Sequence, residues 1–303
     1  MTRRPSRLRA GDRVAVVAPA GPVSPERLAR GCARLRAAGF DVVTGTHVLA
    51  RHGRFAGTDE QRAADLTAAW CDDAVRAVVC ARGGYGTLRL LDHLDPAAFA
   101  TARPPALVGS SDVTVLHRWL ARQAGVVTLY GPMAADRALG TDDLGPEPAD
   151  HLARTLTSPE DTVALRSPGA VELVPGRSTG VVTGGNLNLL AALLGTPDAG
   201  SARGAIVLLE DVAKEGHRID RLLTQLLRAG WFDGVAGVVA GTWANCGPDA
   251  DEVLLERLAP LGVPVLAGFD AGHGPRRLTV PLGLPATLDT GARTLRYAVP
   301  ALA

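Results

Sequence analysis

Leu107-Val108-Gly109-Ser110-Ser111-Asp112-Val113-Thr114 is the stretch of sequence that decides the fold of this chain. An apolar run over residues 105–108 ends at Gly109, and a helical pattern begins at Val115 and ends at Gly125. This order predicts a buried strand, a tight turn and a helix. A serine in such a turn lies at the carboxyl end of a strand, where open α/β sheets place their sites. Helix N-terminal N–H groups beside it can stabilise an oxyanion.

Two interpretations of the serines in this turn stay open at this point. Ser and Asp are ordinary N-cap residues, so simple helix capping explains them. The alternative is a nucleophile elbow, in which a sharp strand-to-helix turn exposes a serine hydroxyl. The segment Gly109-Ser110-Ser111-Asp112-Val113 lacks the second glycine of the usual G-x-S-x-G elbow. An ordinary α/β-hydrolase is therefore not indicated, and the rest of the chain has to decide.

Strands alternate with helices on both sides of this turn. In the first half, strands are predicted at residues 14–18, 40–43, 74–80 and 126–130, with helices between them. This alternation predicts a parallel sheet covered on both faces. In the second half, strands are predicted at residues 180–183, 205–209, 235–240 and 265–268, followed by short strands at 278–281, 286–289 and 294–299.

The fold class predicted from this pattern is α/β with two domains. Residues 1–150 form an N-terminal parallel-sheet domain that carries the candidate nucleophile, and residues 177–303 form a C-terminal α/β domain. Residues 151–176, where prolines interrupt the pattern, are expected to be a linker, and the one helix expected in this region spans residues 149–156.

Composition restricts the partners. The chain has 303 residues and a formal net charge of +1, so it has no electrostatic footprint for nucleic acid or a membrane surface. An arginine-rich start before the apolar residues 14–20 mimics a signal peptide. Asp12 and Arg13 lie against that short run, however, so we expect a buried first strand instead. The four cysteines have no C-x-x-C spacing, which favours reduced thiols and a cytoplasmic protein.

Three polar residues follow predicted buried strands in the order Ser, Glu, His. Glu210 ends the most apolar strand of the second half, where a carboxylate is costly unless it is paired. His273 lies between two glycines after another apolar strand. An acid at a helix N-terminus and a surface-loop histidine are the alternative interpretations of these two residues. Together with the serines, they supply the nucleophile, base and orienting acid that acyl transfer requires.

A glycine-rich turn, Gly83-Gly84-Tyr85-Gly86, also follows a predicted strand. Its backbone N–H groups could cradle an anion, although a purely structural turn is the alternative. It does not match G-x-G-x-x-G, so dinucleotide binding is not indicated. The histidines and cysteines lack the spacing of a zinc site, and we expect neither a metal nor a cofactor.

Eight short motifs lie in order along nearly the whole chain. They are Gly11-Asp12-Arg13-Val14-Ala15-Val16-Val17-Ala18-Pro19, Ala81-Arg82-Gly83-Gly84-Tyr85-Gly86, Val108-Gly109-Ser110-Ser111-Asp112-Val113-Thr114, Gly131-Pro132-Met133, Gly184-Gly185-Asn186-Leu187, Leu209-Glu210-Asp211-Val212, Arg218-Ile219-Asp220-Arg221 and Gly272-His273-Gly274. In this order they resemble the LD-carboxypeptidase family of serine peptidases. That family includes muramoyltetrapeptide carboxypeptidases and microcin C self-immunity peptidases.

The resemblance implies a fold and a set of site residues. The fold is an N-terminal α/β domain and a C-terminal domain with barrel-like β character, with the site between them. The family's serine precedes the aspartate, which selects Ser111, and its acid and base fall on Glu210 and His273. Its oxyanion donors fall on the backbone N–H groups of Gly84 and Asp112. The family often has an aromatic residue where this chain has Ser110, so the substrate subsites stay open.

The activity implied by the resemblance is hydrolysis of the L,D-amide bond that releases terminal D-Ala from murein tetrapeptide during cell-wall recycling. A carboxypeptidase must recognise a terminal carboxylate, and Arg82 and Arg218 are the candidates for this. The expected partner is therefore a small peptide substrate, and we also expect a homodimer.

Two other functions stay open. One is an immunity-type peptidase that cleaves peptidyl or aminoacyl nucleotides, which would benefit from an aromatic platform under the base. Residues 131–230 contain no aromatic residue, which argues against a platform from that region. The other is a non-catalytic module of the same fold that binds a small ligand. The intact set of Ser111, Glu210 and His273 argues against this second alternative.

Overall fold

Alternating side chains along the first strand place apolar residues on both faces of one sheet. In this computed structural model, which describes residues 2–303, the strand is β1 (Arg13–Val17). Val14 and Val16 belong to one buried cluster. Ala15 and Val17 belong to a second cluster on the opposite face. A strand buried on both faces is typical of a parallel sheet sandwiched between helices.

The N-terminal sheet has six strands in the order β12-β5-β4-β3-β1-β2. Its five parallel strands are β1, β2 (Asp41–Thr44), β3 (Val75–Cys80), β4 (Ala106–Gly109) and β5 (Thr128–Tyr130). The sixth, β12 (Val280–Leu282), pairs with β5 in the antiparallel sense. Because β12 comes from the other end of the chain, the second half completes the first half's sheet.

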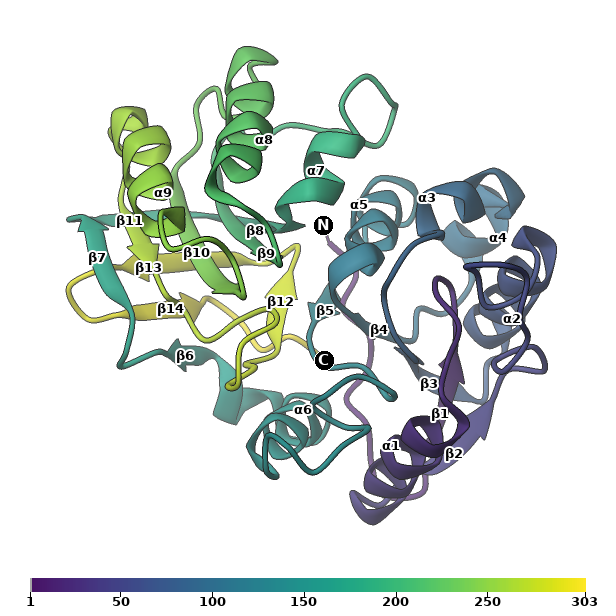
Figure 1. Ribbon diagram of the computed structural model, residues 1–303. Coiled ribbons are helices and arrows are strands. Elements are labelled where there is room, and N and C mark those ends of the chain that lie inside the picture. The colour runs from purple at the N-terminus through teal and green to yellow at the C-terminus, as the bar shows by residue number, and fades with distance from the viewer. Residues whose placement is uncertain (1) are drawn as a thin grey trace.

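Helices cover both faces of this sheet (Figure 1). One face packs on α1 (Pro25–Ala37) and α6 (Glu147–Thr157), and the other on α2 (Asp59–Cys71), α3 (Thr87–Leu90), α4 (Pro96–Thr101) and α5 (Thr114–Gln123). Helix α2 starts with a capping box, in which the Thr58 and Gln61 side chains each accept a hydrogen bond from the other's backbone N–H. The parallel-sheet prediction for the first half is confirmed.

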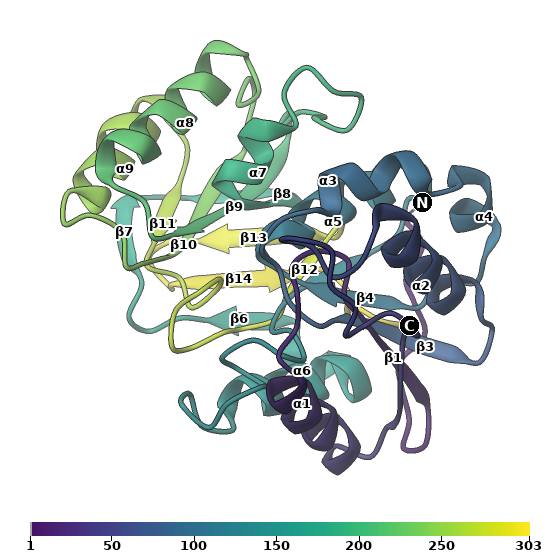
Figure 2. The same ribbon diagram turned by 45° about the vertical axis from the view of Figure 1, so that its right-hand side comes forward.

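The C-terminal sheet has eight strands in the order β6-β14-β13-β8-β9-β10-β11-β7. They are β6 (Ala164–Arg166), β7 (Val171–Val174), β8 (Arg177–Asn186), β9 (Ala205–Val212), β10 (Gly237–Ala244), β11 (Val265–Ala267), β13 (Pro285–Asp289) and β14 (Thr294–Tyr297). Strands β8 to β11 are parallel, and the outer pairs are antiparallel. The helices α7 (Leu187–Ala192), α8 (Gly216–Arg228) and α9 (Ala250–Leu258) lie together over one face (Figure 2).

The segment expected to be a linker is structured. Residues 151–176 complete α6 and then supply β6 and β7, which pair with β14 and β11. Pro168 follows β6 and Pro175 follows β7, so prolines bound these short strands. Strands of three and four residues between prolines give no periodic signal, which is why the sequence pattern appeared weak there.

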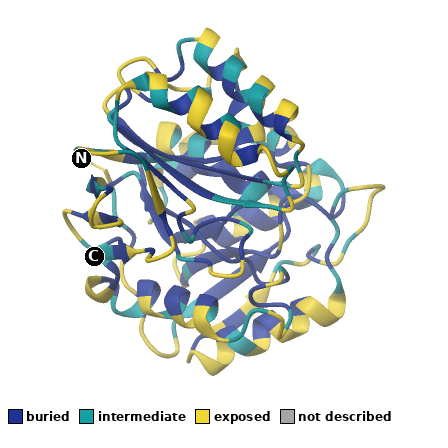
Figure 3. Cartoon of the chain, turned by 60° about the vertical axis from the view of Figure 1, so that its left-hand side comes forward, coloured by how far each residue is buried: buried dark blue, intermediate teal, exposed yellow. Residues whose placement is uncertain are grey.

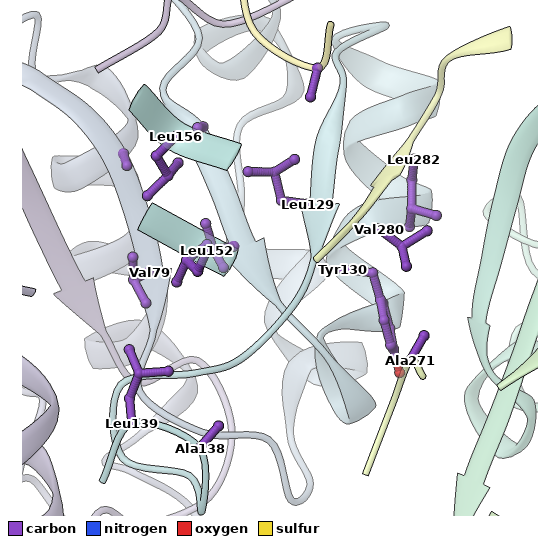
Figure 4. Close-up of a cluster of buried hydrophobic side chains, with 14 of the residues drawn as sticks. Val79, Leu129, Tyr130, Ala138, Leu139, Leu152, Leu156, Ala271, Val280 and Leu282 are labelled. Atoms are coloured by element: carbon purple, nitrogen blue, oxygen red, sulfur yellow. The ribbon is translucent and has the colours of Figure 1, made fainter. Parts of the chain in front are cut away.

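The two halves share one apolar core. A single buried cluster contains Leu129 of β5, Val280 of β12 and Leu208 of β9, together with Leu152 and Leu156 of α6. Figure 4 shows part of this cluster, and Figure 3 shows that exposed residues are concentrated on the outer helices and loops. The shared core holds the carboxyl ends of β4 and β9 in a fixed relation. Within residues 2–303, no helix is long and apolar enough to cross a membrane.

Candidate active site

The turn after β4 has the strained backbone of a nucleophile elbow. Ser111 adopts a φ of 60°, in the left-handed region that non-glycine residues avoid. Such a residue costs on the order of 1–3 kcal/mol, and such residues cluster at functional sites. Helix α5 has Val113 as its N-cap, and among residues 2–303 neither Val113 nor Ser110 makes a side-chain cap hydrogen bond. Simple capping therefore does not explain the serines.

The Asp112 carboxylate joins this turn to the glycine-rich loop. It is 2% exposed and accepts hydrogen bonds from the Thr87 N–H at 2.9 Å and the Thr87 hydroxyl at 2.6 Å. Thr87 is the first residue of α3, directly after Gly86. The two segments that were expected to supply oxyanion donors are thus fastened to each other through a buried side chain.

A buried histidine supports the same turn from below. The ring of His117 is 2% exposed, and its Nε2 lies 2.9 Å from the Gly109 carbonyl oxygen. Burial lowers the pKa of His117 to about 4, so the ring is neutral near pH 7 and Nε2–H donates to that carbonyl. His117 is therefore a structural residue of the elbow.

The missing side chain of Gly83 leaves room directly over the nucleophile. A Cβ built on Gly83 would lie 3.1 Å from Ser111 Oγ and 3.3 Å from the Asp112 nitrogen. Gly84, the next residue, has a φ of +117° that favours glycine. Within residues 2–303, the N–H groups of Gly84 and Asp112 donate no backbone hydrogen bond. Both N–H groups are free to bind an oxygen placed beside Ser111.

Glu210 and His273 form a hydrogen-bonded pair. Glu210 is fully buried on β9, and its Oε2 lies 2.6 Å from His273 Nδ1. Its Oε1 accepts hydrogen bonds from the Tyr130 hydroxyl at 2.6 Å and from Asn186 Nδ2 at 3.1 Å. A buried carboxylate with three donors satisfies the requirement that a charge in this position be paired.

The pairing sets the protonation states. Burial disfavours the charge on Glu210, but the attraction of His273 and the three hydrogen bonds outweigh it and lower the pKa of Glu210 below its usual value. Burial acts against the charged form of His273 too, and Glu210 outweighs it, so the pKa of His273 is raised above 6.5. An ionised Glu210 can only accept, so Nδ1 carries the proton and Nε2 is left as the basic nitrogen.

Contacts from both halves hold the His273 loop. A Cβ on Gly272 would come within 2.5 Å of Glu210 Oε2, so only glycine lets the loop approach the carboxylate this closely. Arg277 donates through Nε to the Gly274 carbonyl at 3.0 Å, and its Nη1 lies 2.7 Å from Asp136 Oδ2. Asp136 belongs to the segment after β5, so this buried ion pair fastens the loop to the N-terminal domain.

A cavity of about 810 Å³ lies where the two halves meet. Its lining includes Ser110, Ser111, Gly84 and Arg82 from the first half and Asn186, Lys214, His273 and Arg277 from the second. No Phe, Tyr or Trp lines it in the part of the chain that the structure describes. Ser111 Oγ makes no side-chain hydrogen bond among these residues, and bonds of this kind often tighten only with substrate in place.

The two arginine candidates differ in position. Arg82 lines the cavity and is oriented by hydrogen bonds from Nε to the Gly83 carbonyl and from Nη1 to the Pro22 carbonyl, both 3.1 Å long. Arg218 is exposed on α8 and does not belong to the cavity lining. Of these two candidates, only Arg82 therefore lies in the cavity that Ser111 lines.

Two residues of the hydrogen-bond network were missed in the sequence. Tyr130 precedes the Gly131-Pro132-Met133 motif, and Asn186 lies within Gly184-Gly185-Asn186-Leu187, so both lay in or next to segments already singled out. Their side-chain roles depend on contacts across 80 and 24 positions of the chain, which no local pattern reveals.

Among residues 2–303 there is no group of three His, Cys, Asp or Glu side chains arranged to hold a metal ion.

Two family models match most of the chain. One, described as the LD-carboxypeptidase N-terminal domain, matches residues 14–131, and the other, the LD-carboxypeptidase C-terminal domain, matches residues 179–288. Ser111 lies in the first match, and Glu210 and His273 lie in the second. A Streptomyces coelicolor protein that is provisionally named a carboxypeptidase is 54% identical over 306 residues, covering 99% of this chain and 97% of its own length.

Solved structures share the fold over nearly the full length. Muramoyltetrapeptide carboxypeptidase from Oxalobacter formigenes matches with a TM-score of 0.81 and 31% identity, over 94% of this chain and 97% of its own. The microcin self-immunity protein MccF of Escherichia coli matches with a TM-score of 0.91 over 99% of this chain and 100% of its own. Its identity in that match is 24%, so this second likeness concerns the fold alone.

Proposed function

Because the chain belongs to the LD-carboxypeptidase family of serine peptidases, we propose that it hydrolyses the L,D-amide bond that releases terminal D-Ala from murein tetrapeptide. The observation that carries the proposal is the arrangement of three groups around one cavity. A serine on a strained turn, a histidine paired with a buried carboxylate and Gly84 with its free backbone N–H all line the same cavity, and the free N–H of Asp112 belongs to the residue directly after the serine. This is the set of parts that acyl transfer by a serine nucleophile uses.

In the first half of the proposed reaction, Ser111 Oγ attacks the carbonyl carbon while His273 Nε2 takes the serine proton. The N–H groups of Gly84 and Asp112 bind the oxyanion of the tetrahedral intermediate. Glu210 keeps the imidazole in the productive tautomer and stabilises the imidazolium. His273 then protonates the leaving amine of D-Ala as the C–N bond breaks, and the tripeptide remains as an ester on Ser111.

In the second half, His273 accepts a proton from a water molecule that attacks this ester. The same two N–H groups stabilise the second tetrahedral intermediate. As the ester C–O bond breaks, His273 returns the proton to Ser111 Oγ. The products are the free tripeptide and D-Ala, and the protein is restored.

Arg82 supplies the recognition of the terminal carboxylate in this proposal. Within residues 2–303 its side chain forms no ion pair with an Asp or Glu, and its guanidinium is held beside Gly84. A planar guanidinium suits bidentate binding of a carboxylate. An all-L tetrapeptide should be a poor substrate, because inverting the Cα turns the carboxylate away from Arg82 and spoils the attack geometry.

The composition of the cavity supports a peptide rather than a nucleotide. Recognition of a base commonly uses stacking on an aromatic ring. No Phe, Tyr or Trp lines this cavity among residues 2–303, whereas charged and amide side chains are plentiful. A peptidyl or aminoacyl nucleotide is therefore the second candidate, and the test below includes one.

Mass spectrometry of murein tripeptide, tetrapeptide and pentapeptide after incubation with the protein tests the proposal. We expect D-Ala release from the tetrapeptide, with no comparable release from its all-L or C-terminally amidated forms. Arg82→Met should raise KM for the free acid by roughly 10- to 100-fold, the loss of a charged hydrogen bond, whereas Arg218→Met should not. Cleavage of an aminoacyl nucleotide in preference to the tetrapeptide would select the second candidate, and equal release from the all-L peptide would contradict the L,D assignment.

The homodimer and the cytoplasmic location expected above stay predictions. Sedimentation velocity at micromolar protein would test the first by giving the mass of the species in solution. Fractionation of the producing cells, with an antibody against this chain, would test the second.

A further inference from the structure

We propose that Tyr130 is a positioning residue whose hydroxyl couples the Ser111 turn of the N-terminal sheet to the Glu210–His273 pair of the C-terminal domain. The inference rests on the proposed serine mechanism, because it concerns how the nucleophile and the base are held relative to each other. It concerns a residue that touches neither the substrate nor the reacting atoms.

The position of Tyr130 in the sheet places it next to the Ser111 turn. Tyr130 is the last residue of β5 and is paired with Gly109 on β4 on one side and with Val280 on β12 on the other. Its side chain is 1% exposed. Figure 4 shows the ring extending from β5 toward Ala271, which precedes the His273 loop. The ring therefore spans from the nucleophile's sheet to the other domain.

The hydroxyl makes two hydrogen bonds whose directions are fixed by their partners. The Ser111 backbone N–H can only donate, so the Tyr130 oxygen accepts it at 2.9 Å. The Glu210 carboxylate can only accept, so the hydroxyl proton is donated to Oε1 at 2.6 Å. Burial raises the pKa of Tyr130 well above 10, and the proton stays on the phenol over the working range of the protein.

These bonds close a chain of contacts around the reacting groups. Glu210 Oε1 binds Tyr130, and Oε2 binds His273 Nδ1. Among residues 2–303, Ser111 Oγ has no direct hydrogen bond to His273. Tyr130 is thus the shortest hydrogen-bonded link between the nucleophile's backbone and the base, and it also supports the φ of 60° at Ser111.

Loss of the hydroxyl should act on proton affinity as well as on geometry. With one donor fewer, Glu210 carries more localised charge and binds the imidazolium form of His273 more strongly. The other charged groups near His273 are Asp211 and Arg277, and neither bonds to Tyr130. The His117 ring packs at 5.7 Å from Tyr130, and its pKa of about 4 keeps it neutral near pH 7. The acid limb of the pH–rate profile, where the rate falls as His273 becomes protonated, should therefore move to higher pH.

Tyr130→Phe, assayed on murein tetrapeptide, tests the proposal against a matched control. Tyr297 is also a buried tyrosine with one hydroxyl bond, to the Pro281 carbonyl at 2.8 Å, and it belongs to no part of the site. Tyr130→Phe should lower kcat by roughly 10- to 100-fold, the range known for removing an outer partner that orients a metal-bound histidine. KM should change little, and the acid limb of kcat/KM should shift upward. Tyr297→Phe should leave both the rate and the limb as in the wild type.

A purely structural role gives a different result. If Tyr130 only stabilised the fold, the variant would contain a smaller fraction of protein that reacts with a fluorophosphonate, in proportion to its kcat, and the acid limb would not move. That outcome would overturn the proposal, and so would an unchanged kcat. Because the fluorophosphonate reacts with Ser111 whatever the natural substrate is, slower labelling of Tyr130→Phe at full occupancy supports the proposal even if the tetrapeptide is not hydrolysed.

A second measurement does not depend on the folding of the phenylalanine variant. The chain has three tyrosines, so the double variant Tyr85→Phe/Tyr297→Phe retains Tyr130 as its one tyrosine, and global incorporation of fluorotyrosine then labels that position alone. Fluorination makes the phenol a stronger donor to Glu210, so the acid limb should shift to lower pH, opposite to the phenylalanine effect. An unmoved limb would contradict the proposal.

Discussion

The two halves of the molecule place their reactive groups by different means. In the N-terminal domain the backbone does the placing: a positive φ aims Ser111, and free N–H groups of a glycine loop and a helix start surround it. In the C-terminal domain side chains do it: a buried carboxylate with three donors holds the imidazole of His273. Activity should therefore be lost when an atom is added close to the backbone that positions Ser111. At His273, activity should instead depend on pH and on each hydrogen bond to Glu210.

Two histidines show the same contrast. His117, in the N-terminal domain, is buried and has no acidic partner within residues 2–303, so burial lowers its pKa to about 4 and it serves as a neutral donor. His273 is paired with Glu210, which raises its pKa above 6.5. The residue type is the same, and the neighbouring charge decides whether the ring is a structural group or a base.

Removing the nucleophile should have the largest effect. Ser111→Ala should lower kcat by roughly 10⁴- to 10⁶-fold, because the covalent route is lost while oxyanion binding remains. Ser110→Ala, one residue away and in extended backbone, should cost far less. The measurement is kcat for D-Ala release from tetrapeptide with both variants folded, as judged by thermal unfolding. Equal losses, or a greater loss for Ser110→Ala, would mean that the wrong serine has been identified.

Breaking the side-chain network at its acid should come next. Glu210→Gln should reduce kcat by roughly 10³- to 10⁴-fold, because the imidazolium loses its counter-charge and the tautomer is no longer fixed. In the wild type, the rate should fall as pH drops through the pKa of His273, at a pH above 6.5, since the base must be neutral. In Glu210→Gln that limb should move to lower pH. If neither kcat nor the position of the acid limb changed in Glu210→Gln, Glu210 would not be the acid of the mechanism.

Adding one carbon to the glycine loop tests the backbone side of the comparison. Gly83→Ala would place its Cβ 3.1 Å from Ser111 Oγ, in the space that the oxyanion needs. We expect kcat to fall by roughly 10²- to 10³-fold, the cost of disabling an oxyanion donor. Gly169→Ala is the matched control, because a Cβ there meets nothing within 4 Å and its φ is not positive. Full activity of Gly83→Ala would place the oxyanion elsewhere.

The smallest predicted effect concerns stability rather than rate. The folded pKa of His117, about 4, lies below the unfolded value of 6.5, so the unfolded chain binds more protons between these values. Its stabilising contribution is complete above pH 6.5 and is lost as pH falls, by about 3 kcal/mol at pH 4. Urea unfolding from pH 7 to pH 4 should therefore show a flatter decline in His117→Gln, which keeps an Nε2 donor. Identical slopes would mean that His117 is protonated in the folded protein.

Much of the N-terminal domain could be predicted because its strands are continuous apolar runs. The strand ending at Gly109 and the strands predicted at residues 14–18 and 74–80 are found where the pattern placed them, within a few residues. β6 and β7 were not predicted, because strands of three and four residues that depend on partners far along the chain carry no periodicity of their own.

The site could be predicted only as separate residues. Ser111, Glu210 and His273 each end or follow an apolar strand, which is a local signal. The contacts of Tyr130 with Glu210 and of Arg277 with Asp136 join positions 80 and 141 residues apart, and only the folded chain reveals them. Arg218 was a candidate because a guanidinium suits a terminal carboxylate, and residue type alone does not tell which face of α8 carries it.

The central claim is that one site is assembled from both domains, with Ser111 as its nucleophile. Labelling with a fluorophosphonate, followed by peptide mapping, tests it most directly and needs no knowledge of the substrate. We predict a single adduct on Ser111, formed much more slowly in Glu210→Gln, whose change lies in the other domain. An adduct on Ser110, or a labelling rate that is the same in Glu210→Gln as in the wild type, would contradict the account.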